Sequence, residues 1–372
     1  MLLLDNIRAA LAWRASTLLP SLHEEGTTCY RLFHGATEGA PGCTLDRYGD
    51  LLLWQTFREP PDISHEVLLP CLRALVEDET GVELTAVHWN ARQRRQQSRE
   101  GVPVPVAPDD LLPAGHAGSE LGLQYLVDVP LPGRDPNLYL DFRAARRWLR
   151  ANSSGRDVLN AFSYTCGAGV AALAGGARSV TNLDFSARAL DIGRGNAQLN
   201  QLPEAAFECL CGDALPTLRQ FAGLPVNTDF RRTQGGGRRG RDRGARGSRP
   251  PSGGGGRGGL SKPLKVRYRQ FDCVVLDPPT WTTTKAGAVD LVRDYQSLFK
   301  PCVLATRPGG TVLAVNHVAS VDLDDWLEIL DRCARKADRP LAELNVLTPE
   351  ADFPSPDGKH PLKMALARVS DE

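Results

Sequence analysis

Four short apolar runs recur at a regular spacing in the second half of the chain, and each ends in a polar residue. The runs end at Asn160, Asp184, Asp213 and Asp277. The first two intervals are 24 and 29 residues, and the third becomes 27 when a 37-residue Gly/Arg-rich segment, 227–263, is left out. This spacing is that of a strand, a helix and the next parallel strand. The pattern predicts an α/β fold with a doubly wound parallel sheet whose carboxyl edge carries these polar residues.

Periodicity outside these runs predicts the remaining elements. Ser186 is placed to cap a helix over 187–202. Further helices are expected at 288–306 and 322–337, and further strands at 311–315, 343–347 and 361–369. Upstream, we expect strands at 51–57, 84–89 and 120–129 and a helix at 63–77. The chain is therefore predicted to have an N-terminal helix (1–26), a small α/β domain (27–130) and a sheet domain (136–372).

The charge of the chain is unevenly distributed, although its formal net charge is zero. Between Arg231 and Arg269 there are 11 Arg and two Lys against one acidic residue. A segment so rich in Gly and Arg cannot bury enough apolar surface to order itself, so we expect 227–263 to be disordered. We expect it at the sheet edge opposite the polar residues. Its charge indicates either a non-specific tether for a polyanion such as RNA or a passive insertion.

Nothing in the sequence indicates a membrane or secreted protein. No apolar run approaches about 18 residues, and the N-terminal run gives way to polar residues within a few positions. Nine cysteines, an odd number without C-x-x-C spacing, indicate buried thiols in a reducing cytoplasm rather than disulfides or a metal site.

The loop after the first strand of the predicted sheet, NAFSYTCGAG (160–169), has the features of a ligand-binding turn. Gly167 and Gly169 would let the backbone approach a ligand at the start of a helix, where amide groups are free. Asp184 can accept hydrogen bonds from both hydroxyls of a ribose, and Asp213 can accept one from an adenine amine. Each feature is common by itself. In this order along one sheet edge, they indicate a site for S-adenosylmethionine.

The segment FDCVVLDPPTW (271–281) combines a strand buried on both faces with an acid, two prolines and an aromatic residue. The strand would deliver Asp277 to the same edge, and Pro278 and Pro279 would hold the turn rigid. Trp281 offers a flat surface for stacking with a planar substrate. An Asp-Pro-Pro turn before an aromatic residue is typical of methyltransferases that act on nitrogen atoms. The structural alternative is a proline turn with a core tryptophan.

Several segments together resemble one family. They are APGCTLDRYGD (40–50), LYLDFRAARRWL (138–149), DVLNAFSYTCGAGV (157–170), FDCVVLDPPTW (271–281) and DFPSPDGKHPLKMALARV (352–369). The chain resembles the bacterial 23S ribosomal RNA large-subunit methyltransferases of the RlmI and RlmK type, from about residue 30 to 372 apart from the insertion. The resemblance implies S-adenosyl-L-methionine as cofactor and RNA as partner. It also implies a Rossmann-like, seven-stranded class I methyltransferase domain behind a small α/β domain that helps to hold RNA. Because only about 30 residues precede the match, we do not expect the PUA domain that opens many members.

The resemblance also carries residue roles. By motif, it places in the cofactor pocket Asn160, Phe162, Tyr164, Gly167, Asp184, Asp213 and Asp277. It places the LDFR element over the methionine end of the cofactor, where Arg143 would pair with the carboxylate. The alternative for Arg143 is a charge on the surface of a helix.

Two acceptor chemistries compete for the reaction. Methylation of cytosine carbon 5 requires a cysteine that adds covalently to the ring. The predicted ends of the fourth and fifth strands, 277–280 and 315–317, contain no cysteine. We therefore favour a ring nitrogen such as guanine N7 in a flipped-out base that stacks on Trp281, with His317 as a substrate contact or a structural residue. The alternatives are a cytosine carbon, a small-molecule or protein acceptor, or a non-catalytic RNA-binding relative.

Overall fold

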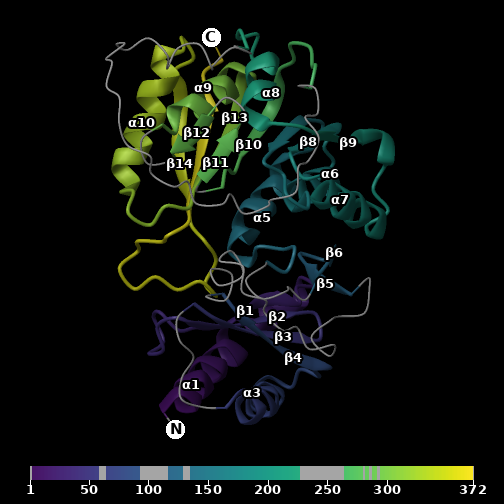
Figure 1. The fold of residues 1–372 in the computed structure, drawn as a ribbon, viewed down its shortest axis with the longest axis vertical. Coiled ribbons are helices and arrows are strands. Elements are labelled where there is room, and N and C mark those ends of the chain that lie inside the picture. Colours follow the sequence, from purple (N-terminus) through teal and green to yellow (C-terminus); the bar gives the residue numbers. More distant parts are fainter. Residues whose placement is uncertain are drawn as a thin grey trace, which may run out of the picture.

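The protein folds into two lobes, each built on its own sheet (Figure 1). The computed structural model describes residues 2–57, 64–92, 116–128, 135–226, 264–279, 281–284, 287–290 and 294–371, with side chains from 281 to 290 left out. The insertion expected at 227–263 lies outside these residues. Within the described ranges, no helix has the length and apolar character that crossing a lipid bilayer requires.

The smaller lobe is a four-stranded sheet in the order β1-β2-β3-β4, with helices on one face. Its strands are β1 (Cys29–His34), β2 (Cys43–Tyr48), β3 (Leu51–Thr56) and β4 (Ala86–Ala91). Its helices are α1 (Leu2–Thr17), α2 (Leu19–Glu24) and α3 (His65–Thr80). Strands β3 and β4 are parallel, and α3 makes the crossover between them. Leu11 of α1, Trp54 of β3 and Leu72 of α3 are buried in one cluster, so the N-terminal helix shares the core of this sheet.

A hairpin of β5 (Ala117–Glu120) and β6 (Leu123–Leu126) lies between the lobes. The sequence pattern predicted one strand over 120–129, but in the structure Glu120 ends β5 and the strand within this range, β6, covers only Leu123–Leu126. Leu121 and Gly122 both have positive φ, 53° and 72°, and join the two strands in a tight turn. Such a turn matches the twist of paired strands. Tyr125 of β6 belongs to the same buried cluster as Cys29 and Tyr48 of the smaller lobe.

The larger lobe is built on a seven-stranded sheet in the order β14-β15-β13-β10-β7-β8-β9. Its strands are β7 (Asp157–Ala161), β8 (Ser179–Asp184), β9 (Phe207–Cys211), β10 (Phe271–Leu276), β13 (Thr306–Asn316), β14 (Leu341–Leu347) and β15 (Lys363–Val369). The five strands from β13 to β9 are parallel, whereas β15 is antiparallel to both of its neighbours. The predicted seven-stranded α/β fold is confirmed, with one strand reversed.

Helices cover both faces of this sheet. One face carries α5 (Arg143–Asn152), α6 (Gly167–Ala174) and α7 (Ala187–Leu199), and the other carries α8 (Ala214–Phe221), α9 (Gln296–Leu304) and α10 (Leu323–Lys336). Short 3-10 turns are η2 (Leu140–Phe142) and η3 (Glu204–Ala206). Cys273 and Val275 of β10 pack on the first face, and Val274 and Leu276 pack on the second. Burial on both faces is why this strand is a continuous apolar run.

The helix predicted at 288–306 is shorter than expected, because a hairpin occupies its first part. Strands β11 (Trp281–Thr284) and β12 (Gly287–Asp290) pair antiparallel, and α9 begins only at Gln296. Three consecutive β-branched threonines follow Trp281, and such residues favour a strand. The cap predicted for α7 is confirmed, since the Ser186 hydroxyl accepts a hydrogen bond from the Ala189 amide at 3.2 Å.

The loop between β14 and β15 reaches from the larger lobe to the smaller one (yellow in Figure 1). An oxygen of Asp352 in this loop accepts a hydrogen bond from the Arg31 amide of β1 at 3.0 Å. The Arg31 guanidinium lies 4.5 Å from the centre of the Phe353 ring. The two lobes are therefore joined by a polar and aromatic contact as well as by the β5–β6 hairpin.

The chain that follows the insertion is arranged differently from the prediction, which placed the insertion at the sheet edge opposite the polar residues. Leu264 is the first described residue after the insertion. Its Cβ atom lies 3.2 Å from the position that a Cβ atom on Gly212 would occupy. Gly212 directly follows β9, so this end lies at the carboxyl edge of the sheet rather than at the opposite edge. Residues 264–270 then run back along α8, held by hydrogen bonds between Gln220 and the backbone of Leu264 and Val266.

Candidate cofactor site

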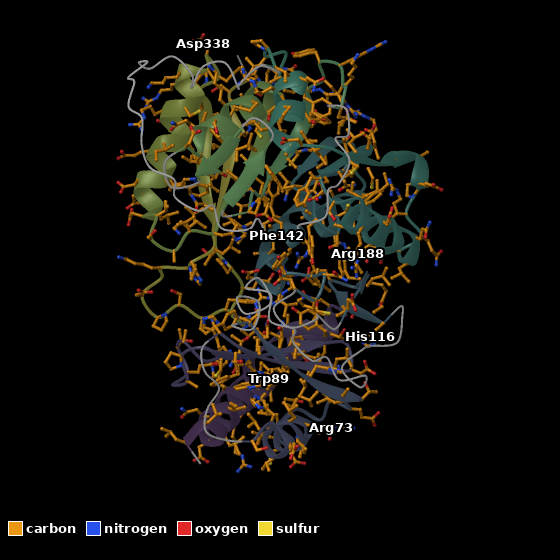
Figure 2. All side chains as sticks on the ribbon, viewed as in Figure 1. Arg73, Trp89, His116, Phe142, Arg188 and Asp338 are labelled. Atoms are coloured by element: carbon orange, nitrogen blue, oxygen red, sulfur yellow. The ribbon has the colours of Figure 1, made fainter. Side chains whose placement is uncertain are left out.

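A cavity of about 650 Å³ opens at the carboxyl edge of the seven-stranded sheet. Among the residues lining it are seven that the sequence predicted, namely Asn160, Phe162, Tyr164, Gly167, Asp184, Asp277 and Pro279. The smaller lobe contributes Arg92, and η2 contributes Asp141 and Phe142. Figure 2 shows Phe142 between the two lobes. The cavity is therefore lined by parts of both lobes. It lies at the sheet edge where the order of the strands predicts a ligand site.

Asp184 is held at the end of β8 by backbone hydrogen bonds. One carboxylate oxygen accepts from the Tyr164 amide at 2.9 Å and the other accepts from the Ser186 amide at 2.8 Å. Burial raises the pKa of this carboxyl above its ordinary value, against the effect of these amides. Each oxygen of a carboxylate has two acceptor sites, so both oxygens can also accept from a pair of hydroxyl groups.

The loop between β7 and α6 has an alternating backbone conformation. Phe162, Tyr164 and Cys166 have φ angles of 58°, 48° and 61°, which are uncommon for residues with side chains. Such conformations cost of order 1–3 kcal/mol each and persist when the surroundings impose them. Here the Ser163 amide donates to Leu183 at 3.0 Å, and the Asn196 side chain donates to the Thr165 carbonyl at 2.9 Å. The sequence pointed to glycines as the residues that shape this loop. In the structure, Phe162, Tyr164 and Cys166 adopt its positive-φ conformations.

Gly169 and Asp213 are not among the residues that line the cavity. A Cβ on Gly169 would lie 2.2 Å from the Asn182 amide oxygen, so this glycine lets α6 pack closely against β8. Asp213 begins α8 as its N-cap residue. Gly169 therefore has a packing role at this position, and the cofactor contacts predicted for Gly169 and Asp213 stay predictions.

Arg143 does not line the cavity, and its predicted pairing with the cofactor carboxylate is corrected by the structure. Its guanidinium is fully buried and donates to Glu350 at 2.6 Å, to Asp352 at 2.5 Å and to the Cys29 carbonyl at 3.1 Å. All three groups lie at the junction of the lobes. Arg143 is neither a cofactor contact nor a charge on the surface of a helix.

Asp277 and His317 form a pair in the cavity wall. Asp277 follows β10 and His317 follows β13, and the register of these parallel strands brings Leu276 opposite Ala314. The His317 Nε2 atom lies 2.6 Å from an Asp277 oxygen. Burial lowers the pKa of His317, but the nearby Asp277 and Asp141 carboxylates outweigh it, and the net pKa is raised above 6.5. The pair therefore favours an imidazolium held against a carboxylate.

The remaining proline and aromatic residues of the D-P-P segment take different positions. Pro279 lines the cavity and Pro278 is buried beside it. Trp281 begins β11, and the stacking role expected of its side chain lies outside the described residues.

The polar wall opposite the sheet was missed in the sequence. Asp135 accepts from Arg92 at 2.6 Å and from the Tyr139 hydroxyl at 2.8 Å. Asn137 accepts from the Tyr164 hydroxyl at 3.3 Å. The sequence assigned no role to Asp135 or Asn137, because these residues are brought to the cavity by the packing of the lobes and follow no periodic pattern.

The chemical groups that line the cavity fit S-adenosylmethionine. Asp184 provides acceptors for ribose hydroxyls, and Phe162 and the largely exposed Phe185 provide apolar faces for a planar base. Asp141 and Asp277 provide negative charge in the same cavity, and the cofactor carries two cationic groups, an ammonium and a sulfonium. Burial and the neighbouring Asp277 raise the pKa of Asp141, His317 and Arg31 lower it, and the net pKa lies above its ordinary value.

Comparison with known proteins decides the family. The S-adenosylmethionine-dependent methyltransferase family model matches residues 30–214, which contain the loop after β7 and Asp184. The chain belongs to the S-adenosylmethionine-dependent methyltransferases. It is 27% identical over 351 residues to the ribosomal RNA large subunit methyltransferase I of Aeromonas salmonicida, covering 94% of this chain and 76% of the relative. The protein of the same name from Klebsiella pneumoniae is 27% identical over 349 residues, covering 94% and 74%.

Two solved structures share the fold of this protein. A protein crystallised with S-adenosylhomocysteine superposes with a TM-score of 0.68 and 19% identity, covering 98% of this chain and 82% of that one. A structure from Streptococcus mutans gives a TM-score of 0.67 and 19% identity, covering 98% of this chain and 81% of that one. The predicted enzyme class, cofactor and family resemblance are confirmed by the family model and the relatives, and the solved structures superpose over both lobes.

Proposed function

We propose that this methyltransferase modifies a base of large-subunit ribosomal RNA, and that the acceptor is a ring nitrogen, with guanine N7 favoured. The ribosomal RNA substrate is supported by the relatives, whose names specify large-subunit ribosomal RNA. The choice of a nitrogen is supported by the composition of the cavity wall.

The observation that carries the nitrogen acceptor is the absence of a thiol where carbon chemistry requires one. None of the nine cysteines is among the described residues lining the cavity. Cys166 is a buried residue of the loop after β7 and Cys273 is buried inside β10, and burial raises the pKa of both thiols. A buried thiol that resists deprotonation is a poor nucleophile. A ring nitrogen needs no covalent help, because its lone pair is already available.

The residues of the wall have separable proposed roles. S-adenosylmethionine supplies a methyl group on a positively charged sulfur. Asp184 would hold the ribose hydroxyls, while Asn160, Phe162, Tyr164 and Gly167 form the adjoining wall. Asp277 and Pro279, at the end of β10, would border the substrate base. This reaction is mainly one of alignment and exclusion of water, so the enzyme contributes by orienting the two reactants.

RNA that enters this cavity must expose its target base. Base-modifying enzymes extrude the nucleotide from its helix and bind it in a closed site. The cavity of about 650 Å³ has room for a cofactor, and Arg92 and Asp135 from the opposite wall are polar groups that an RNA strand would meet. The Arg/Gly-rich insertion is proposed to add non-specific affinity through its charge.

The test is methyl transfer in vitro. Purified protein is incubated with methyl-labelled S-adenosylmethionine and either deproteinised large-subunit ribosomal RNA, transfer RNA or a panel of amines and peptides. We expect label in ribosomal RNA, recovered as 7-methylguanosine after nuclease digestion. Label recovered as 5-methylcytidine would refute the nitrogen acceptor, and label in small molecules or peptides alone would refute the RNA substrate. An Asp277→Asn variant serves to show that the activity comes from this cavity.

A further inference from the structure

We propose that His317 is the residue that selects guanine, by donating a hydrogen bond to the oxygen O6 beside the methylated nitrogen N7. The inference rests on the proposed function and deepens it, because it names the group on the base that the enzyme reads.

The position of His317 provides the first support. The residue follows the carboxyl end of β13, lines the cavity and leaves 35% of its side chain accessible. Its Nε2 atom is engaged by Asp277 at 2.6 Å. Its Nδ1 atom has no hydrogen-bond partner among the described residues. The ring is thus fixed through one nitrogen, and the other is available to a ligand when it carries a proton.

The charged groups around His317 favour that proton. Asp277 faces it from the end of β10, Asp141 from η2 and Lys363 from the start of β15. Arg31 acts on Asp141 from β1. The Lys363 ammonium is directed to the backbone carbonyls of Val318 and Pro361, at 2.8 Å and 3.2 Å. The two carboxylates prevail, so the pKa of His317 is raised and both ring nitrogens are protonated at a higher pH than in an isolated histidine.

The chemistry of guanine matches this donor. Along one edge, guanine presents two acceptors, N7 and O6, whereas adenine presents N7 and an amine donor at the position of O6. An N–H of His317 can therefore bond guanine, but it would face another N–H in adenine. In the reaction, the N7 lone pair forms the new bond to carbon as the carbon–sulfur bond breaks and its electron pair remains on sulfur. No proton leaves, and the positive charge passes to the base.

The Asp277 carboxylate suits this transfer. It lies against the His317 ring in the same cavity wall, so it offsets the charge of the imidazolium and attracts the positive charge that arrives on the base. The N–H of His317 meanwhile donates to O6. Asp277 acts on this donor by orienting the imidazole and is a positioning residue in this respect.

The experiment pairs protein variants with substrate analogues. The target guanosine in a ribosomal RNA fragment is replaced by 2-aminopurine, which keeps N7 and the 2-amino group but lacks O6. For the wild-type protein, kcat/KM should fall about 10- to 100-fold, the usual loss of a hydrogen bond to a charged group. For His317→Phe, which keeps a ring but removes the donor, guanosine and 2-aminopurine should differ by about 2-fold or less. His360→Phe, a change of another histidine outside the cavity wall, should behave as wild type.

A second variant keeps the test decisive if His317→Phe does not fold. His317→Gln retains N–H donors but cannot titrate. Wild-type kcat/KM should decline as pH rises through the raised pKa of His317, and the His317→Gln profile should lack this decline. An unchanged discrimination against 2-aminopurine in His317→Phe, or an unchanged pH profile in His317→Gln, would overturn the role of His317 alone. Wild-type product at another base or atom would overturn this inference together with the proposed function.

Discussion

Arg143 and Asp352 are 209 residues apart in the sequence, yet their side chains form a buried ion pair with an N–O distance of 2.5 Å. Glu350 and the Cys29 carbonyl complete the acceptors of the same guanidinium. The group therefore joins α5, the β14–β15 loop and β1. None of these residues is among the described residues that line the cavity, so we expect Arg143 to act on the cofactor through the fold.

Replacing Arg143 with Met should destabilise the protein without removing a cofactor contact. Loss of one partner leaves buried carboxylates without compensation, which typically costs about 3–5 kcal/mol. We expect a markedly lower melting temperature, while S-adenosylmethionine affinity of the remaining folded protein changes little. Arg147→Ala is the matched control, because Arg147 is about half exposed and surface pairs contribute about 1 kcal/mol or less. Near wild-type stability of Arg143→Met would refute the structural role.

Replacing Asp184 with Ala should weaken cofactor binding. The change leaves two ribose hydroxyls and the Tyr164 and Ser186 amides without their acceptor. The amides lose their acceptor with or without the cofactor, so the lost affinity comes from the two hydroxyls, which together cost about 1–3 kcal/mol, and calorimetry should show an affinity lowered about 10- to 100-fold. Asp213→Ala is the comparison, and a smaller loss is expected because Asp213 stands outside the cavity wall. Unchanged binding in Asp184→Ala would remove this residue from the site.

RNA that contains 5-fluorocytosine should not trap the enzyme. Trapping requires a thiol that adds to the ring, and no cysteine is among the described residues of the cavity wall. Denaturing electrophoresis after incubation with cofactor should therefore show protein and RNA migrating separately. A stable adduct that mass spectrometry maps to a cysteine would contradict the nitrogen acceptor.

Deleting residues 231–260 should weaken RNA binding in a salt-dependent way. The deleted segment is rich in arginine and contains one acidic residue, so its contribution should arise from counterion release and be greatest at low salt. We expect a flatter plot of log affinity against log salt, with cofactor affinity nearly unchanged. The matched control replaces the arginines of the segment with glutamine at constant length. If RNA affinity and its salt slope stay unchanged, the insertion is passive.

The sequence predicted the elements whose pattern is local. The spacing of Asn160, Asp184 and Asp277 placed three strand ends on one edge of the sheet, where the structure has them. The apolar run before Asp277 identified a strand buried on both faces. These features follow from burial on a sheet, which periodicity reports directly.

Features that depend on packing between distant segments were not predictable in the same way. The partners of Arg143 lie in another lobe and in a loop more than 200 residues away. The positive φ angles of Phe162, Tyr164 and Cys166 occur in residues that give no glycine signal. His317 and Asp277 stood at adjacent strand ends in the sequence analysis, but their pairing required the register of β10 and β13.

The central claim is that this enzyme methylates a base of large-subunit ribosomal RNA through the cavity bordered by Asp184 and Asp277. The most direct test is mass spectrometry of ribosomal RNA nucleosides from cells with and without the gene. We predict that the deletion removes one 7-methylguanosine from large-subunit ribosomal RNA. The wild-type gene should restore it, and the Asp277→Asn variant should not. Identical modification of large-subunit ribosomal RNA in the two strains would contradict the account.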